Sequence, residues 1–260
     1  LKQAGITHRE LDVPGLVALQ PMLAESADRL VGAVHYPDDQ VGNARLYCES
    51  LARWLAGEGV AMRFSEQVLG FERTFRSVSA VRTPRGRLEA DAFVLAAGCF
   101  SRPLARQLGM RIPVVPAKGY SVTVPLSDTA PELPVVDDAL HAAVVPLGGD
   151  RLRVAGTAEF AGFDMTVRPE RIRNLLRLLD RIYPGVPVDG ARLDAWAGLR
   201  PMTPDGRPLL GPTRLGNLFL NTGHGALGWT LAAASGKVVA EQVLKLPAAF
   251  DAAAFAPDRF

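Results

Sequence analysis

The chain has 260 residues, of which 48% are apolar and 22% charged, and its net charge at pH 7 is +2. This near-neutral balance is typical of a globular protein and gives no support for a nucleic-acid partner. The sequence has no apolar run long enough for a transmembrane helix. Its two cysteines, Cys48 and Cys99, fit a reducing compartment, so we expect a cytoplasmic protein, although a disulfide between them stays open.

Residues 1–40 are irregular in pattern, because Pro14, Pro21 and Pro37 interrupt any long element. The chain begins with Leu1 rather than with methionine, and no recognisable first strand follows. We therefore expect it to be the interior of a longer protein.

Residues 43–56 are predicted to form an amphipathic helix that Gly57 ends, since Tyr47, Leu51, Trp54 and Leu55 recur at helical spacing. Short strands are predicted after it, at 60–64, 67–73, 79–83 and 88–90. A buried strand at 93–98 then ends in a turn of small residues. This order indicates a mixed α/β unit and not a simple Rossmann half.

Pro113 and Pro116 mark the passage into a second region. Alternating patterns there predict an antiparallel sheet, with strands at 118–125, 142–146 and 151–156. An apolar stripe predicts a helix at 170–183 that covers a face of this sheet. A strand at 191–198 follows, and the chain returns to the first region through 200–211.

The stretch 217–230 carries the most chemical information. A short strand at 218–220 is followed by Gly223, Gly225 and Gly228 and by a helix at 229–244. Such a turn directs backbone N–H groups and the positive end of a helix dipole at an anion or an electron-rich ring. The spacing resembles a dinucleotide fingerprint, but that motif needs a further strand with an acidic residue. Glu241 lies within the predicted helix instead, so a pyrophosphate site is disfavoured.

A family resemblance extends over most of the chain. The stretch 196–211 followed by the glycine turn, together with 94–101, 116–123 and 154–163, resembles the D-amino-acid oxidase/glycine oxidase family of FAD enzymes, and within it the dehydrogenases of D-amino acids. The departure is at the beginning, since members of the family carry their own dinucleotide fingerprint there. About 150 residues of that usual N-terminal part have no counterpart in this chain.

The resemblance implies a mixed α/β fold in which an FAD-binding α/β domain, incomplete at its N-terminus, is interleaved with an antiparallel-sheet substrate domain. We expect the FAD-binding domain at 33–115 and 200–245, and the substrate-binding domain at 1–32 and 116–199.

Arg200 is the first candidate catalytic residue, because the family places an arginine at this position to hold the substrate carboxylate. A guanidinium binds a carboxylate through two parallel hydrogen bonds and thereby fixes its orientation. The alternative is a structural ion pair with Asp194 or Asp205. Tyr120 and His141 are further candidates for the substrate pocket, although packing or a solvated strand position explains each of them equally well.

The remaining candidates would contact the cofactor. We expect the backbone N–H groups of the glycine turn to stabilise negative charge on a reduced flavin, with His224 acting through the shape of the turn rather than as a base. The predicted FAD-binding residues are Ala97, Gly98, Gly223, His224, Gly225, Ala226, Leu227, Gly228 and Trp229. For Ala97 and Gly98, close helix-on-sheet packing is an equal alternative. The scattered histidines and cysteines show no metal-binding spacing.

The resemblance implies FAD-dependent oxidation of a D-amino acid to the 2-oxo acid and ammonia. It also implies a quinone or respiratory electron acceptor and a peripheral association with the inner membrane. Two alternatives stay open. One is an oxidase of glycine, sarcosine or another amine that uses O₂, and the other is a non-catalytic fragment without flavin.

Overall fold

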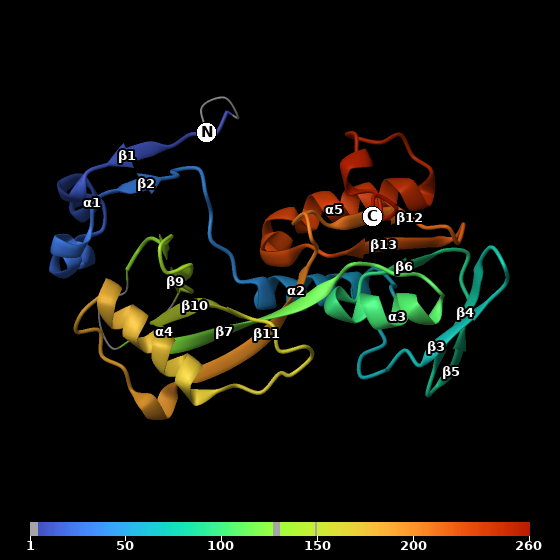
Figure 1. Ribbon diagram of the computed structural model, residues 1–260, viewed down its shortest axis with the longest axis horizontal. Coiled ribbons are helices and arrows are strands. Elements are labelled where there is room, and N and C mark those ends of the chain that lie inside the picture. The colour runs from blue at the N-terminus through green and yellow to red at the C-terminus, as the bar shows by residue number, and fades with distance from the viewer. Residues whose placement is uncertain (1–4, 127–130, 149) are drawn as a thin grey trace. The chain divides into compact units, whose positions relative to one another are not determined.

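The computed structural model describes residues 5–126, 131–148 and 150–260 (Figure 1). The α-helices are α1 (Val13–Leu19), α2 (Ala44–Gly57), α3 (Ser101–Gln107), α4 (Pro169–Ile182) and α5 (Gly228–Leu244). Short 3₁₀ helices lie at Pro21–Arg29, Gly98–Phe100, Gly190–Arg192, Gly225–Leu227 and Ala253–Phe255. No helix in these described ranges has the length and apolar character needed to cross a membrane.

The strands in the first half of the chain are β1 (Arg9–Leu11), β2 (Ala33–His35), β3 (Gly70–Arg73), β4 (Val78–Thr83), β5 (Gly86–Leu88) and β6 (Phe93–Leu95). Those in the second half are β7 (Val115–Pro125), β8 (Val135–Asp137), β9 (Ala142–Pro146), β10 (Arg151–Glu159), β11 (Asp194–Met202), β12 (Leu209–Pro212) and β13 (Leu218–Thr222). The combination of helices with several sheets confirms the predicted mixed α/β class.

The chain divides into two units. Unit 1 comprises Leu1–Glu49, Gly119–Glu159 and Met165–Gly198, and unit 2 comprises Ser50–Lys118, Phe160–Asp164 and Leu199–Phe260. Residues 33–49 thus cluster with unit 1, whereas the sequence prediction puts them in the FAD-binding domain. The short segment Phe160–Asp164 likewise belongs to unit 2. The assignment of a cofactor or a substrate to either unit stays a prediction.

Unit 1 is built on a sheet with the strand order β11-β7-β10-β9-β8, in which the pairs β10/β9 and β9/β8 are antiparallel. Helix α4 lies across this sheet (Figure 1). Its buried stripe, Ile172, Leu175, Leu179 and Ile182, shares one apolar core with side chains of β7, β9 and β10. The predicted helix at 170–183 and its role as a cover for the sheet are therefore confirmed.

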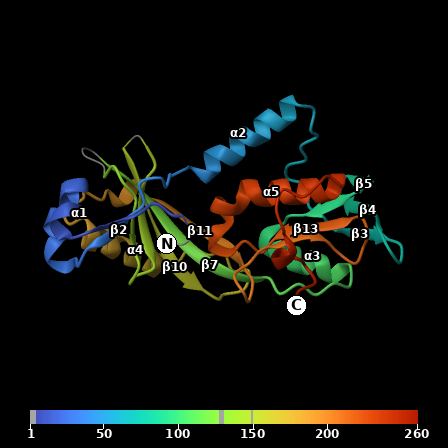
Figure 2. The same ribbon diagram turned by 90° about the horizontal axis from the view of Figure 1, so that it is seen from above.

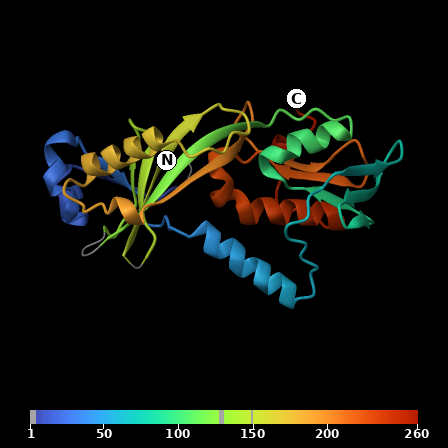
Figure 3. The same cartoon turned by 90° about the horizontal axis from the view of Figure 1, so that it is seen from below.

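Unit 2 contains a sheet with the order β12-β13-β6, in which β13 pairs antiparallel with β12 and parallel with β6. Successive side chains of β13 enter different cores: Leu218 and Leu220 pack with α3, whereas Phe219 packs with α5. Helices α3 and α5 accordingly cover opposite faces of this sheet (Figures 2 and 3). A second, antiparallel sheet joins β3, β4 and β5.

One predicted strand is wrong and one confirmed helix is unusually exposed. Residues 60–64 are not a strand, because their backbone forms no ladder with any described strand, and both Val60 and Phe64 are exposed. Helix α2 forms where predicted, with Leu46 N–H bonded to Asn43 Oδ1 at 3.2 Å, but none of its residues is buried. Amphipathic spacing therefore predicted the helix without predicting a covered face.

Candidate functional site

The two glycine-containing turns predicted to bind the cofactor lie at the same edge of the unit 2 sheet. Since β6 and β13 run parallel, the turn after β6, with Ala97 and Gly98, and the turn 223–228 after β13 both leave from carboxyl ends. Thr222 Oγ1 donates to the carbonyl oxygen of Gly98 at 2.9 Å, across 124 residues of sequence. In open α/β sheets, ligands bind outside the carboxyl ends of the strands.

Backbone conformation explains why glycine occupies these turns. Gly98, Gly223 and Gly225 have φ values of +53°, +78° and +55°, a region that side-chain-bearing residues rarely adopt. At Gly223 a Cβ would also lie 2.7 Å from Cγ2 of Thr203, whereas a Cβ at Gly98 would meet no atom within 4 Å. The space next to Gly98 is thus open to a ligand.

Helix α5 begins directly after the turn, at Gly228. No side chain caps its N-terminus and its first turn holds no acidic residue, so no carboxylate of this helix neutralises the positive end of its dipole. Ala226 and Leu227 lie in the short 3₁₀ helix that precedes α5, and Trp229 lies in the first turn of α5 with 46% of its surface exposed. These groups can face an anion or an electron-rich ring.

The side chain of His224 is held against helix α5. Its Nε2 lies 3.0 Å from Ser235 Oγ on α5, and burial lowers the pKa of the imidazole. The ring is therefore neutral at physiological pH and anchors the turn to the helix. It does not supply a permanent positive charge.

Arg200 lies on β11, in a stretch that touches both turns. Cys99 Sγ donates to the carbonyl oxygen of Leu199 at 3.6 Å, and Sδ of Met202 lies 3.2 Å from where a Cβ on Gly225 would be. Burial lowers the pKa of the Arg200 guanidinium. Asp205, one of the two partners considered for a structural ion pair, is bound by Arg259.

The other two catalytic candidates lie in unit 1. Tyr120 is fully buried, and its hydroxyl donates to Glu159 Oε2 at 2.7 Å. Glu159 Oε1 also forms an ion pair with Arg168 Nη1, at 3.5 Å. His141 is exposed, in the turn between β8 and β9, with φ of +47°. Tyr120 is thus part of a polar cluster, and His141 is a turn residue.

Sequence reasoning missed two polar groups beside the turns. Ser101 Oγ and Asn221 Oδ1 are buried atoms without a hydrogen-bond partner in the described part of the chain. They lie close in sequence to the carboxyl ends of β6 and β13. Buried polar groups normally find partners, so each of these two atoms can accept or share a hydrogen bond with a group that the protein itself does not supply. The sequence did offer one signal for these residues, since each is a small polar residue close to the end of a strand.

Both cysteines are free, Cys48 exposed and Cys99 buried. Burial raises the pKa of the Cys99 thiol, which keeps it protonated. The disulfide left open by the sequence is therefore absent, and Cys99 acts as a packing residue beside Gly98.

Comparison with known proteins relates this geometry to one family. The model for the family DAO, described as FAD dependent oxidoreductase, matches residues 1–242. A D-amino acid dehydrogenase of Granulibacter bethesdensis is 42% identical over 248 residues, which are 94% of this chain and 58% of that protein. One of Paramagnetospirillum magneticum is 44% identical over 245 residues, again 94% of this chain and 58% of the relative. The chain therefore spans little more than half the length of these relatives.

A solved structure agrees with the family match. Glycine oxidase from Geobacillus kaustophilus superimposes with a TM-score of 0.90 at 28% identity, over 100% of this chain and 69% of that one.

Proposed function

Because the chain belongs to the DAO family of FAD dependent oxidoreductases, we propose that the full-length protein oxidises a D-amino acid to the 2-oxo acid and ammonia. Membership of this family confirms the expected cofactor, FAD. The observation that carries the proposal is sequence identity. Two relatives named D-amino acid dehydrogenase are 42% and 44% identical to this chain, each over 94% of its length.

The groups that would hold FAD in this chain lie at the carboxyl ends of β6 and β13. Gly98 would offer open backbone on one side, with Ala97 beside it, and N–H groups of the turn 223–229 would offer hydrogen-bond donors on the other, apart from that of Leu227, which donates to the carbonyl oxygen of His224. Donors fixed before the reaction stabilise charge that grows during it.

The amino-acid substrate would be held by Arg200. Its partly buried guanidinium would bind the carboxylate bidentately and orient the Cα–H bond. FAD supplies the two-electron acceptor for the hydride that leaves Cα. The resulting imino acid is hydrolysed by water to the 2-oxo acid and ammonia. Tyr120 and His141 remain proposed contributors to the substrate pocket.

The reduced cofactor must then pass its electrons on, and we propose a quinone or another respiratory carrier as acceptor, reached at the cytoplasmic face of the inner membrane. The likeness to a glycine oxidase favours one alternative, an amine oxidase that uses O₂. The two differ in their product, because only the oxidase releases stoichiometric hydrogen peroxide.

The test uses the full-length protein, whose visible spectrum reports bound flavin. We expect anaerobic bleaching by D-alanine, reoxidation by a soluble quinone and little peroxide in air. Bleaching by glycine or sarcosine with stoichiometric peroxide would establish the oxidase instead. A colourless protein to which added FAD does not bind would favour the non-catalytic alternative.

Replacing Arg200 by lysine keeps the charge and removes the guanidinium fork. We expect kcat/KM for D-alanine to fall by about tenfold to a hundredfold, because one charge-assisted hydrogen bond is lost. Arg73→Lys, on an exposed arginine of the same unit, is the control that leaves kcat/KM unchanged. An equal effect in both variants would remove Arg200 from the site.

A further inference from the structure

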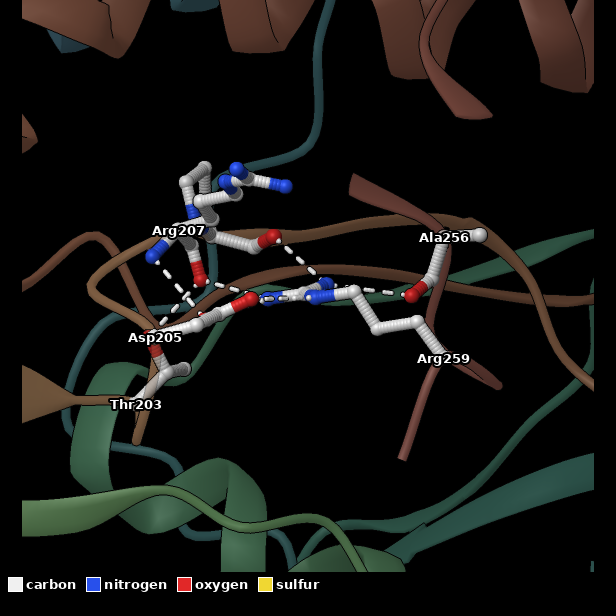
Figure 4. Close-up of polar contacts among 6 residues, drawn as sticks. Thr203, Asp205, Arg207, Ala256 and Arg259 are labelled. Atoms are coloured by element: carbon white, nitrogen blue, oxygen red, sulfur yellow. Dashed lines mark hydrogen bonds and ion pairs between the residues drawn. The ribbon is translucent and has the colours of Figure 1, made fainter. Parts of the chain in front are cut away.

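Arg259 uses all five of its N–H groups, four of them to bind the loop of residues 203–208, which joins β11 to β12, and one to bind Ala256 (Figure 4). Its Nε and one N–H of Nη2 donate to the two carboxylate oxygens of Asp205, at 2.9 and 3.0 Å. The other three N–H groups donate to main-chain carbonyl oxygens, those of Arg207, Ala256 and Pro208, at 2.8, 3.0 and 3.1 Å. This arrangement leaves no guanidinium donor for another ligand.

The pair is shielded from solvent more than an ordinary surface ion pair. The side chain of Arg259 is only 14% exposed and that of Asp205 31%. The Arg259 guanidinium carbon also lies 4.7 Å from the ring centroid of Phe260, which supports the cation from its other side. The hydrogen bonds from Arg259 are the main reason that the pKa of the Asp205 carboxyl is far below its usual range.

The same loop touches the glycine turn. Thr203 Oγ1 donates to the carbonyl oxygen of Arg207 at 2.8 Å, which links the beginning of the loop to the residue that Arg259 holds. The methyl carbon Cγ2 of Thr203 lies 2.7 Å from where a Cβ on Gly223 would be, and Leu209 N lies 3.6 Å from that point. Gly223 therefore packs directly against a loop whose other side is fixed by Arg259.

We propose that Arg259 is a positioning residue for the glycine turn. By tying the segment after α5 to the loop 203–208, it holds Thr203 against Gly223 and keeps the N–H groups of residues 223–228 in one orientation. This goes beyond the proposed function, in which the turn itself contacts FAD. The consequence for the flavin rests on that proposed function, whereas the consequence for the turn does not.

The first experiment measures amide hydrogen exchange in the full-length protein, with Arg259→Lys and Asp205→Asn as test variants. Each variant weakens the pair of hydrogen bonds between the Arg259 guanidinium and the Asp205 carboxylate while keeping the size of the side chain similar. We expect exchange at residues 222–228 and 203–208 to accelerate by about tenfold, since a bidentate charge-assisted contact is lost. Arg87→Lys is the matched control, because Arg87 Nε also donates to a carboxylate, that of Glu72, at 2.9 Å, in the β3-β4-β5 sheet.

A second control separates positioning from general destabilisation. Val78→Ala removes two buried methyl groups from the apolar core that Val78 shares with side chains of α3, and the fall in Tm that it causes is compared with that of the test variants. Local acceleration at 222–228 in the Arg259 and Asp205 variants, and not in Val78→Ala, supports the proposal. Acceleration confined to 203–208, or no change in either segment, overturns it.

The second experiment concerns the flavin, by redox titration of the holoenzyme. We expect Arg259→Lys to weaken FAD binding or lower the flavin potential, with Arg87→Lys unchanged. A third outcome is that amide exchange at residues 222–228 accelerates while the reduction potential of the bound flavin stays unchanged. In that case the turn does not act on the cofactor as the proposed function requires. If no flavin binds to the wild type, the proposed function fails and the exchange result still decides the role of Arg259.

Discussion

Gly223 shows most clearly how one residue determines this site. Its φ of +78° favours glycine, and a Cβ at this position would also lie 2.7 Å from Cγ2 of Thr203, so two independent reasons disfavour a side chain here. The glycine is therefore needed for the turn whatever ligand binds there. The pattern of glycines in the sequence indicated the turn, but not the neighbour that packs against it.

Gly223→Ala is expected to lower the free energy of unfolding by about 2–4 kcal/mol, from the positive φ and the clash together. Adding Thr203→Ser removes the methyl group that clashes and keeps the hydroxyl that donates to Arg207. The double variant should recover about half of the loss in urea unfolding. No recovery at all would show that the contact with Thr203 does not constrain the turn.

Tyr183 gives a prediction about alkaline pH. Burial raises its pKa to about 12, although Gln20 Nε2 donates to its hydroxyl at 3.3 Å. A raised folded-state pKa gives stability that is complete below the unfolded value of about 10 and is lost as the pH rises from there toward 12. Above pH 10 the wild type should lose up to about 1.4 kcal/mol per pH unit more than Tyr183→Phe. Parallel urea-unfolding curves for the two proteins from pH 9 to 11 would contradict this.

At the scale of elements, local patterns predicted what local interactions stabilise. The helices at 43–56 and 170–183 and the strand at 142–146 appear within one residue of their predicted bounds. The short elements α1 and α3 were not predicted, because seven residues carry too little periodicity. The strand β12 was missed as well, since its partner β13 and not its own sequence defines it.

The residue that ends helix α5 has a backbone conformation that is unfavourable for its residue type. Lys245 adopts the left-handed conformation, φ 55° and ψ 36°, while its N–H bonds back to the carbonyl oxygens of Gln242 and Glu241. Because glycine adopts this conformation without strain, Lys245→Gly should raise the free energy of unfolding by about 0.5–1 kcal/mol. Urea unfolding measures the change, with Lys245→Ala as the control that gains nothing. Destabilisation by glycine would indicate that the lysine side chain has a role.

At the scale of the whole molecule, unit 2 is made of three separate segments of the chain, and the middle segment is only Phe160–Asp164. An ion pair and a ring contact help to hold that short segment. Lys118, whose side chain is completely buried, binds Asp164 Oδ2 at 3.0 Å, and the rings of Phe100 and Phe163 lie 5.2 Å apart. A buried cation thus fixes a segment that sequence alone assigned to the other domain.

Asp164→Asn should therefore destabilise the protein by about 1–3 kcal/mol, since it leaves the buried ammonium with less compensation. Glu72→Gln, which breaks an exposed pair with Arg87, is the control and should change stability by less than about 0.5 kcal/mol. Equal effects in urea unfolding would mean that burial of Lys118 adds nothing to the pair.

The sequence by itself determined the class of fold, the existence of the glycine turn and the family, because these depend on periodicity and on residues that stand close together in the chain. The tertiary structure decided which distant residues meet: the parallel pairing of β6 with β13 joins Gly98 to Thr222, and Arg259 reaches back to Asp205. Pairing of strands and packing of loops depend on contacts between segments far apart in sequence, and no local pattern records which segments those are.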